Sequence, residues 1–236
     1  MSTYLYSPLP PEGEYIRLLS ILPNEDETAA LQCKLRNYSL QKLSIRTHLY
    51  EALSYVWGNP HETLPIHVDG EQFCVTVNLH AALSRLRDPS LQRILWVDAI
   101  CINQENSEEQ GQQVQLMAKV YSKAHRVIVW LGEAADFSNE ALKAIYVATN
   151  EQSMSSSKEI IQQSILALKK YQDSSNNGRI QQTILDLQEI HGAADNQSTN
   201  PAIKMHQQAI LNLIKRAWFH RIWVREQTID YMLRQY

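Results

Sequence analysis

The sequence has 236 residues, 44% of them hydrophobic and 20% charged, a balance that is typical of a folded globular chain and excludes general disorder. Its formal net charge is -3 and its basic residues form no cluster, so we expect neither a nucleic-acid partner nor a membrane partner. No apolar run approaches the roughly 20 residues of a membrane span, and the first residues lack a signal-peptide pattern. With three widely spaced cysteines, the composition indicates a cytoplasmic protein with reduced thiols.

The first half of the chain carries strand patterns separated by turn signals. Asp69-Gly70 lies between two alternating runs and predicts a β-hairpin, and Gly58-Asn59-Pro60 predicts a turn after a short apolar strand. The later apolar runs are continuous, which is typical of strands buried on both faces. We expect strands at residues 15–22, 31–35, 52–57, 66–68, 73–77, 94–97 and 127–131.

Two amphipathic helices are expected among these strands. Asn78 is a suitable N-cap for the first helix, and Ser107 with Gln110 forms a capping box for the second. Helices alternating with buried strands predict a parallel sheet that is covered on both faces. The apolar faces consist of Leu79, Ala82, Leu83 and Leu86 in the first helix, and Val114, Met117, Val120, Tyr121 and Ala124 in the second.

The second half of the chain has a different character. From Phe137 onwards Gln, Ser and Asn accumulate, strand patterns end, and amphipathic runs alternate with segments rich in Ser and Asn that we expect to be loops. We therefore expect a single domain with an α/β core at residues 15–135 and a mainly helical part at residues 136–236 that packs on the core.

Polar residues at the ends of the predicted strands are the first candidates for a site, because ligands of parallel sheets bind beyond the carboxyl ends of strands. Two interpretations weigh about equally: these residues converge on one ligand, or Asp98 and Asn103 cap the following turn while Trp57 fills core. We interpret Cys101 as a buried core residue rather than as a nucleophile. The strand-end candidates are Ser54, Tyr55, Trp57, Gly58, Asp98 and Asn103.

Tryptophan and arginine are concentrated in residues 216–227. Trp218, Arg221 and Trp223 form either an aromatic–cation stack that docks a helix or the wall of a pocket for a planar ring, and the residues alone favour docking. The glycines form no phosphate-binding loop and the histidines have no metal-ligand spacing, so we expect no metal site.

Four motifs in the chain resemble those of the heterokaryon-incompatibility (HET) domain of filamentous fungi, an intracellular module that triggers cell death after non-self recognition. Residues 50–58 (YEALSYVWG) are similar to its opening motif, and residues 95–104 (LWVDAICINQ) are similar to its second. Residues 127–132 and 218–227 resemble the third and fourth motifs.

The resemblance implies distant kinship to TIR domains. It implies a TIR/flavodoxin-like parallel sheet flanked by helices, with an inserted β-hairpin and an added helical region. Some TIR domains hydrolyse NAD, so NAD is expected as a substrate and no tightly bound cofactor is expected. The resemblance further implies self-association and an upstream activating receptor or partner domain.

A catalytic carboxylate is also implied by the resemblance. In TIR enzymes it follows a pattern like Trp-Cys-x-x-Glu, and Trp223-Val-Arg-Glu-Gln227 is the similar stretch here. HET domains commonly have Gln before Glu at this place, whereas Glu226 precedes Gln227 in this chain. The expected catalytic residues are Glu226, Gln227 and Asp98, and the expected ligand-binding residues are Ser54, Tyr55, Trp57, Gly58, Asn103, Arg221 and Trp223.

Three functions remain open at this stage. The first is an NAD glycohydrolase that is activated by clustering of the domain. The second is a non-enzymatic adaptor, for which the polar helices of residues 154–208 would form the assembly surface. The third is a nucleotide sensor that binds its ligand without turnover. The kinship to TIR domains favours the enzyme or the nucleotide-binding function.

Overall fold

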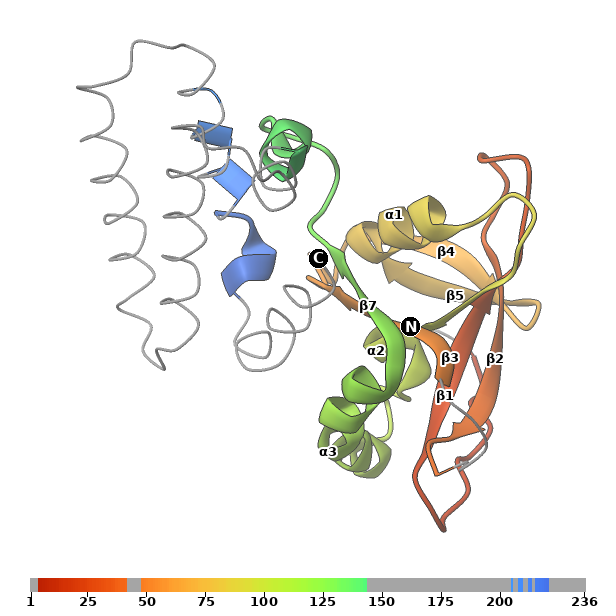
Figure 1. The fold of residues 1–236 in the computed structure, drawn as a ribbon. Helices are drawn as coiled ribbons and strands as arrows, with labels where there is room; N and C mark the ends of the chain where they lie inside the picture. Colours follow the sequence, from red (N-terminus) through yellow and green to blue (C-terminus); the bar gives the residue numbers. More distant parts are fainter. Residues whose placement is uncertain are drawn as a thin grey trace. The chain divides into compact units, whose positions relative to one another are not determined.

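The computed structural model describes residues 4–41, 48–143, 205, 208–209, 212–213 and 215–220. The chain divides into two compact units, Met1–Gly132 and Glu133–Tyr236. The first unit contains a seven-stranded sheet with helices beside it (Figure 1), which confirms the predicted α/β class. The second unit is described only in part, so the expected helical part of the chain lies mostly outside the described residues.

The sheet has the order β5-β4-β2-β1-β6-β3-β7. Its directions are mixed: β6, β3 and β7 run parallel to one another, whereas β1 is antiparallel to both β2 and β6. The prediction of a parallel sheet is therefore right for the three strands β6-β3-β7 and wrong for the sheet as a whole. The strands are β1 (Tyr15–Ile21), β2 (Gln32–Ser39), β3 (His48–Tyr55), β4 (Thr63–Val68), β5 (Glu71–Thr76), β6 (Arg93–Trp96) and β7 (Ala124–Trp130).

The hairpin of β4 and β5 forms where the sequence predicts it. Asp69 and Gly70 both have positive φ angles, of 53° and 89°, as a two-residue turn between twisted antiparallel strands requires. The hairpin is inserted between β3 and the first helix, and β4 also pairs with β2 in parallel. The hairpin thus extends the sheet on the side away from the three parallel strands.

Three helices complete the first unit: α1 (Val77–Leu86), α2 (Asp98–Cys101) and α3 (Ser107–Lys123). Their N-caps differ from the predicted ones. Thr76 caps α1 by accepting from the Leu79 N–H, and Asn106 caps α3 by accepting from two backbone N–H groups. The predicted caps Asn78 and Ser107 instead lie within the first turn of each helix, and Asn78 has a different role that is described below.

The helices α1 and α3 lie on opposite faces of the parallel strands. The ring of Trp96 packs edge-on against Tyr121 of α3, with centroids 5.5 Å apart, whereas the indole of Trp130 donates to Asn78 of α1. Trp96 of β6 and Val127 of β7 both pair with Ala52 of β3, so their side chains point to the same face of the sheet. Trp130 lies three residues after Val127. Side chains an odd number of residues apart point to opposite faces of a sheet.

This arrangement creates a switch point in the sheet. The chain leaves β3, reaches β6 on one side by way of α1, and then reaches β7 on the other side by way of α3. Where successive connections cover opposite faces of parallel strands, a crevice opens beyond their carboxyl ends. The carboxyl end of β3 is therefore the place where the fold favours a ligand.

The hydrophobic core of the first unit is built from all seven strands and from α1 to α3. One predicted core position is wrong. Val114 of α3 is 42% exposed, whereas Gln113 is buried and donates to the carbonyl of Tyr15 at 2.8 Å. The helix therefore turns a polar residue inwards, because the neighbouring strand start offers that residue a backbone partner. The largest fully buried residues of the unit include Trp96, Arg17, Tyr50, Tyr55, Ile16 and Leu19.

The described part of the second unit contains a helical turn at residues 138–143 and the 3-10 helix η1 (Ala217–His220). Trp218 is 2% exposed. The guanidinium of Arg216 donates to the carbonyls of Glu133 and Ala135, both at 3.0 Å. Arg221 and Trp223 lie outside the described residues, so both interpretations of this segment stay predictions.

Candidate functional site

The structure joins two of the predicted site residues directly at the carboxyl ends of β3 and β6. Nε1 of Trp57 donates to Oδ2 of Asp98 at 3.0 Å. Asp98 is 8% exposed, whereas Trp57 is 40% exposed. A buried carboxylate therefore fixes the orientation of an indole ring that keeps much of its surface in solvent.

Asp98 is engaged through all of its oxygens. Oδ1 accepts from the backbone N–H of Ala99 at 2.8 Å, and the carbonyl accepts from Nε2 of Gln104 and from the N–H of Ile102. Because each carboxylate oxygen already holds a protein donor, Asp98 is suited to positioning the turn and Trp57. A catalytic role for Asp98 stays a prediction.

Asn103 shapes the loop that follows α2. Its Oδ1 accepts from the N–H of Glu105 at 3.1 Å, and its own N–H donates to Oε1 of Glu109 at 2.8 Å. Its side-chain carbonyl thus stabilises the turn, as the capping interpretation of the sequence predicts. The loop that carries Asn103 also reaches Asp98 through Gln104, so the two predicted residues belong to one connected backbone segment.

Asn78 connects the ends of β3 and β7, although the sequence predicted for it only the role of an N-cap. Its Nδ2 donates to the carbonyl of Val56 at 2.5 Å, and its Oδ1 accepts from Nε1 of Trp130 at 2.9 Å. Gly58 packs beside it with φ of 82°, where an added Cβ would lie 3.3 Å from the Cβ of Asn78. Both partners lie more than 20 residues from Asn78 in the sequence, so no local pattern indicated this role.

The remaining predicted strand-end residues lie inside the sheet. Ser54 is 5% exposed and Tyr55 is 1% exposed. Tyr55 is level with Trp130 in the register of β3 and β7, so it supports the strand ends from within the core. We call Trp57, Asn78, Asp98 and Trp130 the strand-end cluster, and of the four it is Trp57 that presents the most surface.

The predicted residues of the fourth motif cannot be placed in this cluster from the structure. Arg221, Trp223, Glu226 and Gln227 all lie outside the described residues. Their convergence with Trp57 stays a prediction.

Cys101 is a core residue in α2. It is fully buried, and its Sγ accepts from the backbone N–H of Val97 at 3.3 Å. Burial raises the pKa of the Cys101 thiol to about 12, so the group is a neutral thiol near pH 7 and a weak nucleophile.

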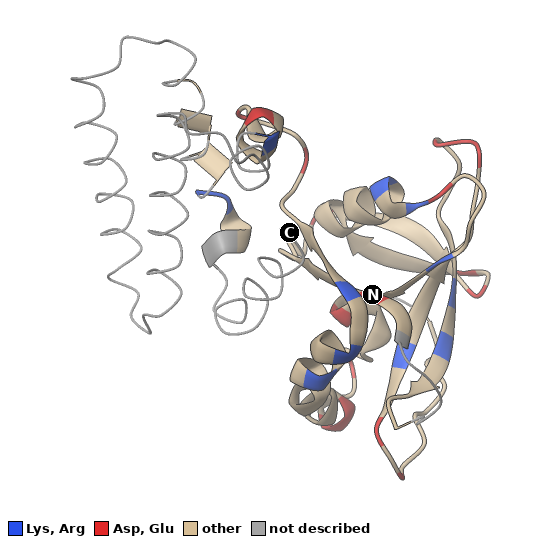
Figure 2. Cartoon of the chain, in the orientation of Figure 1, with Lys and Arg blue, Asp and Glu red and all other residues tan. Residues whose placement is uncertain are grey.

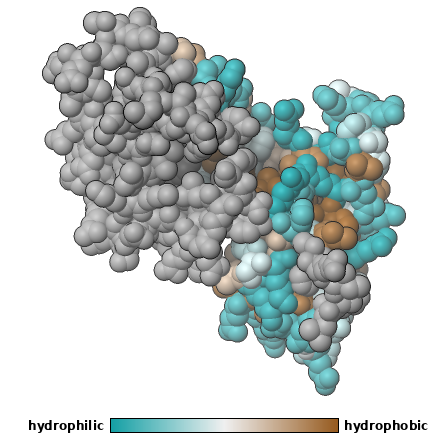
Figure 3. Space-filling view, viewed as in Figure 1, coloured by the Kyte–Doolittle hydropathy of each residue, from teal (hydrophilic) through white to brown (hydrophobic). Residues whose placement is uncertain are grey.

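The surface of the described residues gives no sign of a metal centre or of a single-sign charge patch. No group of three or more His, Cys, Asp or Glu side chains in this part of the chain is arranged to hold a metal ion. Acidic and basic residues are interspersed (Figure 2), and hydrophilic residues surround scattered apolar ones on the visible face of the first unit (Figure 3). No helix within the described ranges is long and apolar enough to span a bilayer.

The fold and the cluster define an α/β protein in which two tryptophans, each hydrogen-bonded to a polar side chain, lie at the carboxyl ends of parallel strands. The sequence identifies its family: residues 50–226 match the model of the heterokaryon incompatibility protein (HET) family, which covers most of the chain. The chain belongs to this family, and the resemblance seen in its motifs is confirmed.

A curated relative is similar to part of the chain. Heterokaryon incompatibility protein 6, OR allele, of Neurospora crassa is 39% identical over 144 residues, which cover 56% of this chain and 21% of that protein. The chain thus matches about a fifth of the length of this relative. No solved structure matches the chain.

Proposed function

We propose that this chain is a domain of fungal heterokaryon incompatibility that triggers cell death, and that its strand-end cluster binds NAD. Its membership of the HET family supports the first part. The observation that carries the second part is the Trp57–Asp98 pair, in which a buried carboxylate orients a tryptophan that is 40% exposed.

The geometry of this pair suits a ligand with a planar ring. Since the indole N–H of Trp57 is bound to Asp98 and the residue is 40% exposed, the contact that we propose for the ligand is stacking on the ring. Stacking of a base on such a face contributes about 1–3 kcal/mol to binding. The nicotinamide and adenine rings of NAD both have the required shape, and the switch point at β3 is where dinucleotides bind in related sheet architectures.

The proposed reaction is hydrolysis of the bond between nicotinamide and ribose. Water adds to C1′ of the ribose, nicotinamide leaves with the bonding electron pair, and one proton is released. The transition state has oxocarbenium character, which a nearby carboxylate stabilises. Asp98 is engaged in holding Trp57 and the N–H of Ala99, and we propose Glu226 of the fourth motif as that carboxylate.

The test uses the purified full chain, clustered by fusion to an oligomeric scaffold and incubated with NAD. Nicotinamide release is followed by chromatography. We expect Glu226→Gln to abolish release, and the double variant Glu226→Gln with Gln227→Glu, which restores the usual order of the family, to raise it. The exposed Glu105→Gln in the α2–α3 turn is the matched control and should leave release unchanged. Absence of release from both the native chain and the double variant would refute the hydrolase.

Binding without turnover is tested separately by calorimetry with NAD. Trp57→Ala should weaken binding by about 5- to 150-fold if the ring stacks on the ligand. An unchanged affinity would show that NAD, if it binds, binds elsewhere. If expression of a chain carrying both Trp57→Ala and Glu226→Gln still kills fungal cells, the non-enzymatic adaptor is the correct function.

A further inference from the structure

The helix α2 carries Asp98 as its first residue but is only four residues long. It contains a single turn, and its last carbonyls have no partner further along a helix. Two side chains from the start of the chain fill this gap. The hydroxyl of Tyr6 donates to the carbonyl of Ile100 at 2.9 Å, and NH1 of Arg17 donates to the carbonyl of Cys101 at 3.2 Å.

Arg17 is the centre of this anchorage. It is 2% exposed, and its guanidinium forms a bidentate ion pair with the carboxylate of Glu109, with N–O distances of 2.5 and 3.0 Å. The same guanidinium donates to the carbonyl of Ser7 at 2.8 Å and lies 4.9 Å from the ring centroid of Tyr6. Since Glu109 also accepts from the N–H of Asn103, Arg17 connects β1, α2, the loop after it, and α3.

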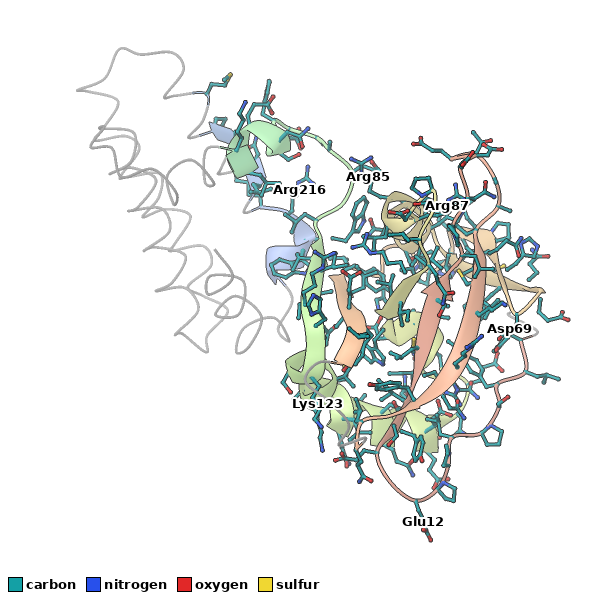
Figure 4. All side chains as sticks on the ribbon, turned by 45° about the vertical axis from the view of Figure 1, so that its right-hand side comes forward. Glu12, Asp69, Arg85, Arg87, Lys123 and Arg216 are labelled. Atoms are coloured by element: carbon teal, nitrogen blue, oxygen red, sulfur yellow. The ribbon has the colours of Figure 1, made fainter. Side chains whose placement is uncertain are left out.

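Residues 4–8, which we call the strap, are held at several points. The hydroxyl of Tyr4 donates to Oδ2 of Asp69 in the hairpin turn at 2.8 Å, and Figure 4 labels Asp69 on that turn. The rings of Tyr4 and Tyr6 pack edge-on against each other and against Phe73 of β5. Burial raises the pKa of Tyr6, so its hydroxyl stays protonated and able to donate near pH 7. The strap is thus a bound segment with one contact to α2.

We propose that the strap and Arg17 set the position of α2, and through Asp98 the position of Trp57, so that displacement of the strap loosens the strand-end cluster. Tyr6 and Arg17 are positioning residues that act from outside residues 50–226, the part that matches the family. A partner that binds the strap would therefore control the ligand-binding edge without touching it. The effect on ligand rests on the proposed function, but the effect on Trp57 does not.

The matched pair of variants for the test is Tyr6→Phe and Tyr4→Phe. Both keep an aromatic ring in the strap, but only Tyr6→Phe removes a hydrogen bond to α2. The readout is hydrogen exchange of the Trp57 indole N–H in the full, ligand-free chain, followed by nuclear magnetic resonance and assigned with Trp57→Phe. We expect Tyr6→Phe to accelerate this exchange about fivefold, the effect of one ordinary hydrogen bond, and Tyr4→Phe, which leaves the hydrogen bond of Tyr6 to α2 in place, to accelerate it clearly less.

A stability measurement separates positioning from general destabilisation. The melting temperatures of the two variants should be similar, and the indole N–H of Trp130, which is bound to Asn78, should exchange at the native rate in both. Equal exchange of Trp57 in the two variants, or equal acceleration of Trp57 and Trp130, would overturn the inference. Because no NAD is present, accelerated exchange in Tyr6→Phe supports the strap even if the native chain fails to bind NAD.

Discussion

The hydrogen bond between Trp57 and Asp98, two residues 41 positions apart, predicts a measurable energetic coupling between their motifs. The perturbation is a double-mutant cycle with Trp57→Phe, Asp98→Ala and the combined variant. Phenylalanine keeps an aromatic ring but removes the indole N–H together with part of the bicyclic ring system. Alanine removes the carboxylate that accepts from both Trp57 and the backbone N–H of Ala99.

The expected magnitudes follow from these partners. A hydrogen bond to a carboxylate contributes about 1.5–3 kcal/mol, and a buried donor without a partner costs about 1–3 kcal/mol. Trp57→Phe should therefore lower the free energy of unfolding by about 1.5 kcal/mol. Asp98→Ala should lower it by about 3 kcal/mol, because the N–H of Ala99 also loses its acceptor. The coupling between the two sites should be about 1.5 kcal/mol, since water partly replaces Asp98 at the exposed indole.

The assay is urea denaturation of the four chains at one pH, followed by circular dichroism. The control cycle combines Asp98→Ala with Trp130→Phe, because the indole N–H of Trp130 donates to Asn78 rather than to Asp98. Its coupling should be within about 0.5 kcal/mol of zero. A Trp57–Asp98 coupling that is no larger than the control coupling would refute the conclusion that Asp98 holds Trp57.

Three further predictions concern backbone strain, charge and thiol burial. Gly58→Ala should destabilise the chain by about 1–2 kcal/mol in urea denaturation, because alanine is strained at φ of 82°, and an equal free energy of unfolding would contradict this. Burial alone would raise the pKa of the Glu109 carboxyl, but the ion pair with Arg17 and the backbone N–H of Asn103 outweigh burial and lower this pKa below 4.5. Glu109→Gln should therefore lower the free energy of unfolding by about 3 kcal/mol at pH 7. That cost should shrink as the pH falls below 4.5 through the folded pKa, because the native carboxylate then takes up a proton, and a constant cost would argue against the pair. Cys74 is exposed while Cys33 and Cys101 are buried, so maleimide should label Cys74 in the native chain and the other two only after unfolding, as mass spectrometry can show.

The local features of the fold were accessible from the sequence because they depend on near neighbours in the chain. Asp69-Gly70 specified the hairpin turn, and the spacing of Leu79, Ala82 and Leu83 specified the buried face of α1. The strand order was not accessible, because β1 pairs with β6 through contacts between residues more than 70 positions apart. Alternation of apolar residues defines a strand but says little about the direction of its partner.

The candidate site was accessible only in part for a similar reason. The sequence placed Trp57 and Asp98 at strand ends, and the structure bonds them to each other. The role of Asn78 depends on Val56, which follows β3, and on Trp130 of β7, so its position at a helix start favoured an N-cap. Asn is common at helix starts because it caps them, so the sequence pattern is the same when the side chain bonds to other parts of the chain instead. Only the neighbours of Asn78 in the fold distinguish an N-cap from a link between strand ends.

The hydrogen bonds of the strand-end cluster also constrain any chemistry at this edge. The two indole N–H groups of Trp57 and Trp130 are each bound by a side chain, and the carboxylate of Asp98 has a donor on each oxygen. The protein's own hydrogen bonds therefore hold the cluster in one arrangement. In the proposed hydrolysis of NAD, the catalytic carboxylate would come from the fourth motif, where Glu226 precedes Gln227. Exchanging these two residues tests the proposed hydrolase more directly than any change within the cluster.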